Sequence, residues 1–135
     1  DPEAAKIVIE APVKKVICPL EIGKEALIFP EISEQIKQLN GTGEMFYALF
    51  KRYRGGSFST GLKMYDSTAV AYLLAPEIYT LSNEYVAIET KGELTQGASI
   101  IDINKKMGKE ENAVVAVSVD ADAFRKWFVA AVEKC

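Results

Sequence analysis

The feature that most constrains the fold is one short apolar run near the start of the chain, followed by helical sequence and only much later by further strands. Residues 13–18 are β-rich and end at Pro19, a pattern typical of a strand buried in a parallel sheet. Such a strand needs neighbours, which must come from later strands or from sequence outside these 135 residues. Strands mixed with helices in this way indicate an α/β or α+β arrangement.

The expected elements follow from spacing, caps and breaks. A helix is predicted from Pro2, with Asp1 as its cap and Pro12 as its stop. Further helices are predicted at residues 24–29, 31–39, 44–53 and 67–74, and after Asp120 or Asp122. The last of these has an apolar stripe that is expected to face the core, made of Phe124, Trp127, Phe128, Ala131 and Val132. Strands are predicted at residues 85–90, 98–103 and 113–119. Breaks in regular structure are predicted at residues 40–43 and, as a loop rich in glycine and serine, at residues 55–61.

Composition excludes several classes of partner. The length fits one domain or part of one. A net charge of −3 argues against a general nucleic-acid partner. No apolar run approaches the roughly 20 residues that a membrane-spanning helix needs. Two cysteines without a framework, and no export signal, make a cytoplasmic location the expectation.

Histidine is absent, and this limits the chemistry that the chain can perform. Imidazole is the side chain best suited to proton transfer near neutral pH. Any catalysis must therefore use carboxylates, tyrosines, a metal ion or residues of another chain. Cys18 and Cys135 have no zinc or redox spacing, and Cys18 is expected to act as a small buried apolar residue.

Asp66 lies where the loop rich in glycine and serine becomes a helix. One interpretation is an N-cap, in which the side-chain oxygen accepts a hydrogen bond from a backbone N–H. The other is a ligand for a hard cation, because a carboxylate at the mouth of a helix can face a cleft and bind calcium. The local pattern leaves both roles open.

Five separated segments agree in order and spacing with one known family. They are residues 1–8, 18–21, 65–74, 89–97 and 119–124. Together they resemble the C-terminal portion of the inosine/uridine-preferring nucleoside hydrolases. The resemblance covers nearly all of this chain and about the last two-fifths of a typical member. It implies an α/β fold: the C-terminal part of an open, mostly parallel sheet with helices, plus a late antiparallel hairpin. Residues 1–135 would form a single, incomplete domain of this kind.

The resemblance also implies a reaction. Members bind one calcium ion at the carboxyl ends of the sheet, where it holds the ribose hydroxyls and a water. An aspartate near the N-terminus activates that water, which attacks the anomeric carbon as the N-glycosidic bond breaks. In many members a histidine just before the late calcium-binding aspartate assists the departure of the base.

Carried over to this sequence, the resemblance makes Asp66 a calcium ligand and places Tyr65 at the leaving-group histidine position. Tyrosine hydroxyls ordinarily have a pKa of about 10, so Tyr65 suits hydrogen bonding or stacking better than proton transfer. Tyr53 and Phe58 fall in the region that covers the base pocket, and either could stack on a base. Gly23 and Lys24 stand where the family often has Thr-His.

The aspartate-rich N-terminal motif of the family has no counterpart here. The prediction is therefore a C-terminal portion of a calcium-dependent nucleoside hydrolase that is inactive by itself and binds calcium weakly. Its uncovered apolar surface predicts a homo-oligomer or association with an N-terminal half. Two alternatives stay open: a non-catalytic remnant that binds a small ligand or a protein, and an unrelated small α/β interaction domain.

Overall fold

The computed structural model describes residues 1–54 and 56–135. These residues form two compact units, one made of Asp1–Ile17 and Leu81–Ala116, the other of Cys18–Thr80 and Val117–Cys135. Each unit is therefore built from two stretches that are distant in the sequence. Residue 55, part of the predicted loop at 55–61, lies outside the described residues.

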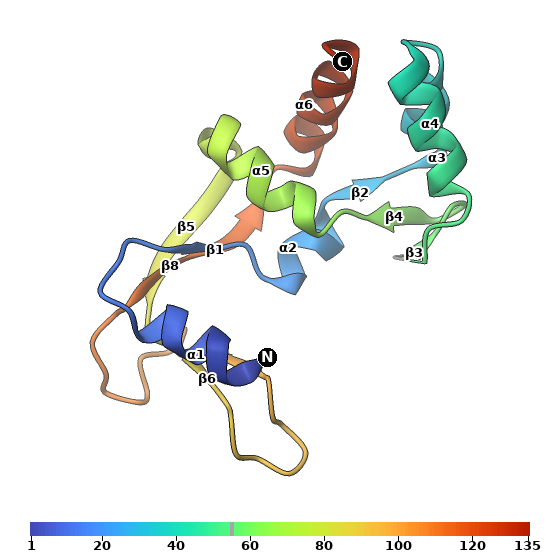
Figure 1. Ribbon diagram of the computed structural model, residues 1–135. Coiled ribbons are helices and arrows are strands. Elements are labelled where there is room, and N and C mark those ends of the chain that lie inside the picture. The colour runs from blue at the N-terminus through green and yellow to red at the C-terminus, as the bar shows by residue number, and fades with distance from the viewer. Residues whose placement is uncertain (55) are drawn as a thin grey trace. The chain divides into compact units, whose positions relative to one another are not determined.

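The first unit is a helix with short strands (Figure 1). Its elements are α1 (Pro2–Glu10), β1 (Val16–Ile17), β6 (Val86–Ile88), β7 (Ser99–Ile101) and parts of β5 (Tyr79–Glu84) and β8 (Ala113–Val119). β1 pairs in parallel with β8, whereas β6 and β7 form an antiparallel pair. The sheet that contains β1 has the order β1-β8-β5. The predicted parallel strand thus finds its neighbour about a hundred residues further along the chain.

A small apolar core holds this unit together. Buried Val86, Ala113 and Val115 form its centre. Ile9 of α1 and Ile17 of β1 pack against them, so the helix and both stretches of the sequence share one core. The predicted strand at 13–18 is shortened to two residues, because the chain just after α1 forms a bend in which the Val13 N–H donates to the Ala11 carbonyl.

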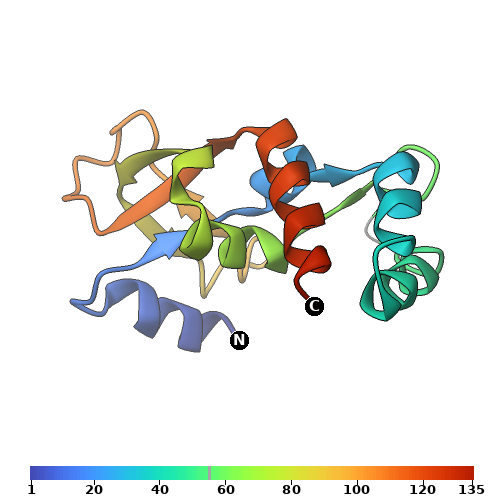
Figure 2. The same ribbon diagram turned by 90° about the horizontal axis from the view of Figure 1, so that it is seen from above.

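The second unit is mainly helical. Its elements are α2 (Leu20–Glu25), β2 (Leu27–Ile28), α3 (Pro30–Lys37), α4 (Gly41–Phe50), β3 (Gly56–Ser57), β4 (Gly61–Lys63), α5 (Asp66–Leu74), the 3-10 turn η1 (Pro76–Ile78) and α6 (Ala121–Glu133). The strands form a small antiparallel sheet of order β2-β4-β3. Helices α3 and α4 pack side by side (Figure 1 and Figure 2).

The predicted apolar stripe of α6 is the core of this unit. Phe124 is fully buried and Phe128 and Val132 nearly so. The ring of Phe128 lies 6.2 Å from that of Phe46 and 6.3 Å from that of Phe50, both on α4. Aromatic rings at such separations bury large areas and attract one another through their edges and faces. The interpretation of this stripe as core-facing is confirmed.

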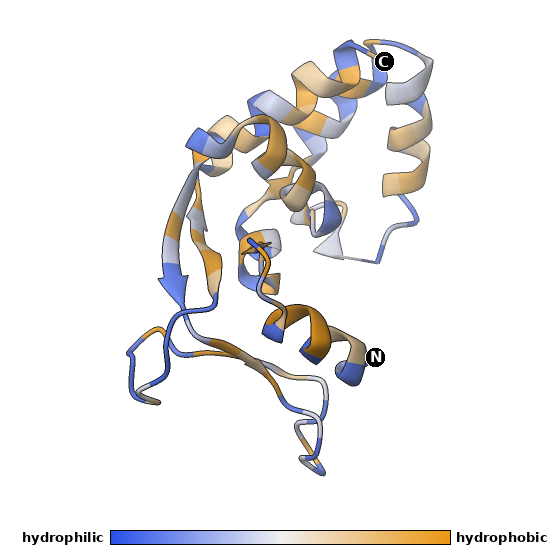
Figure 3. Ribbon diagram, turned by 60° about the vertical axis from the view of Figure 1, so that its left-hand side comes forward, coloured by the Kyte–Doolittle hydropathy of each residue, from blue (hydrophilic) through white to orange (hydrophobic). Residues whose placement is uncertain are grey.

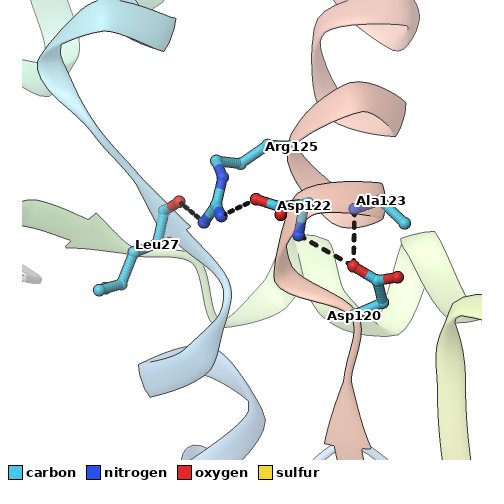
Figure 4. Close-up of polar contacts among 5 residues, drawn as sticks. All are labelled: Leu27, Asp120, Asp122, Ala123 and Arg125. Carbon is cyan, nitrogen blue, oxygen red and sulfur yellow. Dashed lines mark hydrogen bonds and ion pairs between the residues drawn. The ribbon is translucent and has the colours of Figure 1, made fainter.

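Polar contacts fix the start of α6 (Figure 4). The Asp120 carboxylate accepts hydrogen bonds from the N–H groups of Asp122 and Ala123, each at 3.0 Å, which makes Asp120 the N-cap. Arg125 pairs with Asp122 and donates to the carbonyl of Leu27 at 3.3 Å. The start of the last helix is thereby tied to strand β2.

Several predicted elements were wrong. Residues 24–29 were expected to be helical, but α2 ends at Glu25 and Leu27–Ile28 form β2. The helix expected at 44–53 begins at Gly41, because Asn40 caps it by accepting the Gly43 N–H at 2.9 Å. Strand β5 was not predicted, and the expected loop contains β3 and the start of β4.

The chain is thus a mixed α/β protein with small sheets. None of the helices in the described part of the chain combines the length and apolar character that crossing a bilayer requires.

Candidate functional site

The candidate site lies at the junction of β4 and α5. Strand β4 pairs with β2 so that Lys63 is opposite Leu27, and the next residue, Met64, donates its N–H to the Ala26 carbonyl at 3.2 Å. The chain then turns at Tyr65, and α5 begins at Asp66. The small sheet therefore determines where these two side chains emerge.

Hydrogen bonds from Thr68 stabilise this turn. Its backbone N–H and its hydroxyl both donate to the Tyr65 carbonyl, at 3.0 and 2.6 Å. The Tyr79 hydroxyl donates in turn to the Thr68 carbonyl at 2.7 Å, and burial raises the pKa of Tyr79. Thr68 is itself buried, so the backbone that carries Tyr65 and Asp66 is held from inside the unit.

Asp66 is the first residue of α5, and its side chain is exposed. The interpretation of Asp66 as an N-cap is wrong: Tyr65 occupies the cap position, and no side chain caps this end of the helix. A carboxylate in the first turn still gains from the positive end of the helix dipole. Asp66 therefore presents its oxygens to the surroundings at a position that favours negative charge.

Tyr53 follows α4 and lies beside the same turn. Its hydroxyl donates to the Lys63 carbonyl at 3.1 Å, and its side chain is partly exposed. The pKa of Tyr53 is raised, first by partial burial and then by the negative charges that Tyr65 and Asp66 carry when ionised. Three of the four residues predicted for the site are thus brought close together.

Phe58 is placed differently. Its ring packs edge-on against Tyr47 of α4, with the ring centroids 5.8 Å apart. Tyr47 also has the ammonium groups of Lys37 and Lys51 over its ring. Phe58 is therefore part of an aromatic contact with α4.

Gly23, which stands with Lys24 where the family often has Thr-His, meets Tyr65 through a contact that the sequence did not predict. It lies in α2 and is buried, and the ring of Tyr65 occupies the space where a Cβ of residue 23 would lie. The helix predicted at residues 24–29 began after Gly23, so a glycine inside a helix, which is unfavourable without a packing reason, did not stand out in the sequence. Its neighbour Lys24 is exposed and pairs with Glu21 at 3.8 Å, as expected for a solvated side chain.

The residues of this chain do not by themselves fit a calcium ion. Calcium takes six to eight oxygen ligands. Across residues 1–54 and 56–135, no group of three or more acidic, cysteine or histidine side chains is placed to hold a metal. Asp66 offers one carboxylate. Beside it, the Ser67 hydroxyl is buried and has no hydrogen-bond partner within the described residues.

Comparison with known proteins identifies the family. Residues 1–126 match the family described as inosine-uridine preferring nucleoside hydrolase. The chain therefore belongs to the inosine-uridine preferring nucleoside hydrolase family. The resemblance inferred from the five sequence segments is confirmed.

The similar curated proteins include non-specific ribonucleoside hydrolases RihC. That of Salmonella enteritidis is 42% identical over 127 residues, which are 94% of this chain and 42% of the relative. That of Salmonella heidelberg is 42% identical over 135 residues, which are 100% of this chain and 44% of the relative. The chain thus spans less than half the length of the curated relatives it matches.

Solved structures share the fold. An inosine-guanosine nucleoside hydrolase matches with a TM-score of 0.79 and 25% identity, over 98% of this chain and 44% of the other. The plant nucleoside hydrolase PpNRh1 matches with a TM-score of 0.83 and 17% identity, over 100% and 46% of the two chains. The mixed α/β structure is thus part of the nucleoside hydrolase fold.

Proposed function

We propose that this chain is the C-terminal portion of a calcium-dependent nucleoside N-ribohydrolase, which hydrolyses the N-glycosidic bond of nucleosides to base and ribose. The observation that carries the proposal is the approach of Tyr53 to the turn of Tyr65 and Asp66 at the start of α5, where its hydroxyl donates to the Lys63 carbonyl at 3.1 Å. Membership of the family and the names of the similar relatives support it. In this proposal both units belong to one domain, whose open and mostly parallel sheet is completed by sequence that the 135 residues do not span.

Each residue of the site has a proposed role. Asp66 would supply one carboxylate to a calcium ion, whose other ligands would come from the rest of the family fold. Such an ion, when bound, would orient the ribose and help to create the nucleophile. Tyr65 donates a hydrogen bond to the departing base or stacks on it. Tyr53, which lies beside the same turn, lines the base pocket. For Phe58, stacking on the base stays a prediction. Its ring already packs against Tyr47, so we give it a smaller part in the proposed site than Tyr53.

The apolar surface of the first unit supports association with an N-terminal portion of the fold. Ile7 and Val8 of α1 are 70% and 59% exposed, and much of this helix is coloured as hydrophobic in Figure 3. A groove of about 400 Å³ lies beside it, lined among others by Val8, Ile17 and Ile88. Apolar surface of this kind marks a contact site. We propose that the N-terminal portion of the fold covers it, and that the isolated 135 residues self-associate.

Size-exclusion chromatography tests the second half of that proposal. The 135-residue chain is expected to elute above the size of a 14.8 kDa monomer. A stable monomer at micromolar concentration would contradict self-association. The two free cysteines, Cys18 and Cys135, fit a reducing compartment, so a cytoplasmic location is part of the proposal.

The enzymatic proposal is tested with a fused protein. The part of the Salmonella enteritidis ribonucleoside hydrolase that this chain does not span is joined ahead of Asp1 (hereafter the fused protein). The fused protein is expected to release ribose from inosine or uridine in the presence of calcium, and the 135-residue chain is expected to release none.

Two substitutions make the assay specific. Asp66→Asn removes the proposed ligand, and Glu44→Gln is the matched control, an exposed acid in the first turn of another helix. Ribose release is expected to fall at least about a hundredfold with Asp66→Asn and to stay unchanged with Glu44→Gln. A well-folded fused protein without ribose release would overturn the proposal and favour a non-catalytic binding domain.

A further inference from the structure

Gly23 lies inside the helix α2 and is buried. Glycine in the interior of a helix is unfavourable relative to alanine, because it loses more conformational freedom on folding. A buried glycine at such a position therefore calls for a packing reason.

The reason lies in the ring of Tyr65. A Cβ built on Gly23 would lie 2.3 Å from Cδ1 and 2.9 Å from Cε1 of that ring. Non-bonded carbon atoms come to rest about 3.5–4.0 Å apart, so the two groups cannot share this space. The edge of the Tyr65 ring thus occupies the place that any other residue at position 23 would fill.

The backbone on either side cannot move away easily. The same Cβ would lie 3.2 Å from the Met64 carbonyl oxygen, and Met64 is held by its hydrogen bond to Ala26. The Tyr65 carbonyl is held by both donors of Thr68. Relief of the clash therefore requires the Tyr65 ring to turn or to move away from its present position.

We propose that Gly23 is a positioning residue: the absence of a side chain there sets the orientation of the Tyr65 ring beside Asp66 and Tyr53. Gly23 and Tyr65 act as a matched pair, in which a bulky ring at the leaving-group position requires an empty position on α2. The catalytic consequence rests on the proposed function, whereas the packing of the pair does not.

The packing is tested by a double-mutant cycle of Gly23→Ala and Tyr65→Ala, with urea unfolding of the fused protein and of the 135-residue chain. Gly23→Ala alone is expected to lower the urea midpoint, because the ring is displaced. In the Tyr65→Ala background the same change is expected to lower the midpoint much less, because the ring is gone and only the Met64 carbonyl oxygen, at 3.2 Å, stays close to the added Cβ. If Gly23→Ala does not fold while the double variant does, that outcome also supports the pairing of Gly23 with the Tyr65 ring.

The matched control is Gly41→Ala. Gly41 also lies in a helix, but a Cβ built there meets nothing within 4 Å. Its effect on the midpoint is expected to be the same whether Tyr65 is present or has been replaced by alanine. If Gly23→Ala also shifts the midpoint by the same amount and sign in both backgrounds, the pairing is refuted.

Activity gives the readout that a purely structural role would not move. In the fused protein, Gly23→Ala is expected to lower kcat/KM about tenfold or more, since a misplaced catalytic group costs rate. The double variant is expected to lose no more activity than Tyr65→Ala alone, because both changes remove the same ring from the same place. Additive losses would overturn the positioning role. An inactive but folded fused protein would overturn the proposed function alone, and the urea cycle would still decide the packing.

Discussion

Helices α1 and α6 begin in the same way, but their apolar faces have different surroundings. Each starts at an aspartate that caps it, Asp1 accepting from the Ala4 N–H at 2.8 Å and Asp120 from two N–H groups. Each carries an apolar stripe at helical spacing. In α6 the stripe is buried among aromatic rings, whereas α1 has no buried residue at all.

The difference teaches that periodicity predicts a helix and its apolar face, but not what covers that face. Each helix packs within its own unit: α6 against α3, α4 and α5, and α1 against the strand β6. The chain spans less than half the length of its relatives, so the open side of α1 is where the rest of the family fold is expected to pack.

The largest expected effect is on α6, the helix whose apolar face is buried. Phe124→Ala removes a fully buried ring from α6 and is expected to lower the free energy of unfolding by about 3–5 kcal/mol. Urea unfolding followed by circular dichroism measures this loss. A loss below about 1 kcal/mol would show that the α6 core is not formed as described.

A matched pair of valines sharpens the comparison. Val132 of α6 is 3% exposed and Val8 of α1 is 59% exposed. Val132→Ala is expected to cost about 2 kcal/mol and Val8→Ala less than about 0.5 kcal/mol in the 135-residue chain, measured at a dilution at which the proposed self-association is absent. In the fused protein the cost of Val8→Ala is expected to rise above about 1 kcal/mol, because the face is covered. Equal costs in both proteins would contradict the proposed cover.

The two N-caps are expected to differ less in their contribution to the free energy of unfolding. Asp120→Ala is expected to lower the free energy of unfolding by about 1 kcal/mol, because two N–H groups lose their acceptor. Asp120→Asn is the control, since asparagine caps about as well as aspartate. Asp1→Ala, which removes a single exposed bond, is expected to cost less than Asp120→Ala by the same urea measurement. The reverse order would contradict the account of the two helix starts.

The smallest effect concerns the hairpin that follows β6. The N–H groups of Lys91 and Gly92 donate to the Glu89 carboxylate, at 2.7 and 2.9 Å, and lower its pKa from the ordinary value of 4.5. Because the folded pKa is lowered, the carboxylate stabilises the fold above pH 4.5, and this contribution is lost as the pH falls through the folded pKa.

An NMR titration of the Glu89 side chain measures this directly. Its midpoint is expected below that of a glutamate in an unfolded peptide, in the 135-residue chain and in the fused protein alike. A normal midpoint in the 135-residue chain, beside a lowered one in the fused protein, would show that the hairpin forms only under the cover proposed for α1.

The sequence predicted those elements whose patterns are strong and local. The stripe of Phe124, Phe128 and Val132 is one example, and the cap and proline that begin α1 are another. It failed where pairing with a segment distant in the sequence determines the secondary structure. The apolar run Ala26 to Phe29 reads equally well as helix or strand, and its pairing with β4, more than thirty residues later, makes it a strand.

The same holds for the site. Tyr65 and Asp66 are neighbours in the sequence, so their position at a loop-to-helix junction could be predicted. The approach of Tyr53 depends on the end of α4 lying beside β4, and that of Gly23 on α2 lying beside the same turn. No local pattern contains such contacts, because they arise only when the unit folds.

Calcium binding tests the central proposal most directly, namely that Asp66 is one ligand of a metal site whose other ligands lie outside these 135 residues. Isothermal titration calorimetry with calcium is run on the 135-residue chain, on the fused protein and on its Asp66→Asn variant. The account predicts one tight site in the fused protein, binding at least about tenfold weaker in the variant, and no tight binding to the 135-residue chain. Tight binding to the 135-residue chain, or unchanged affinity in the variant, would contradict it.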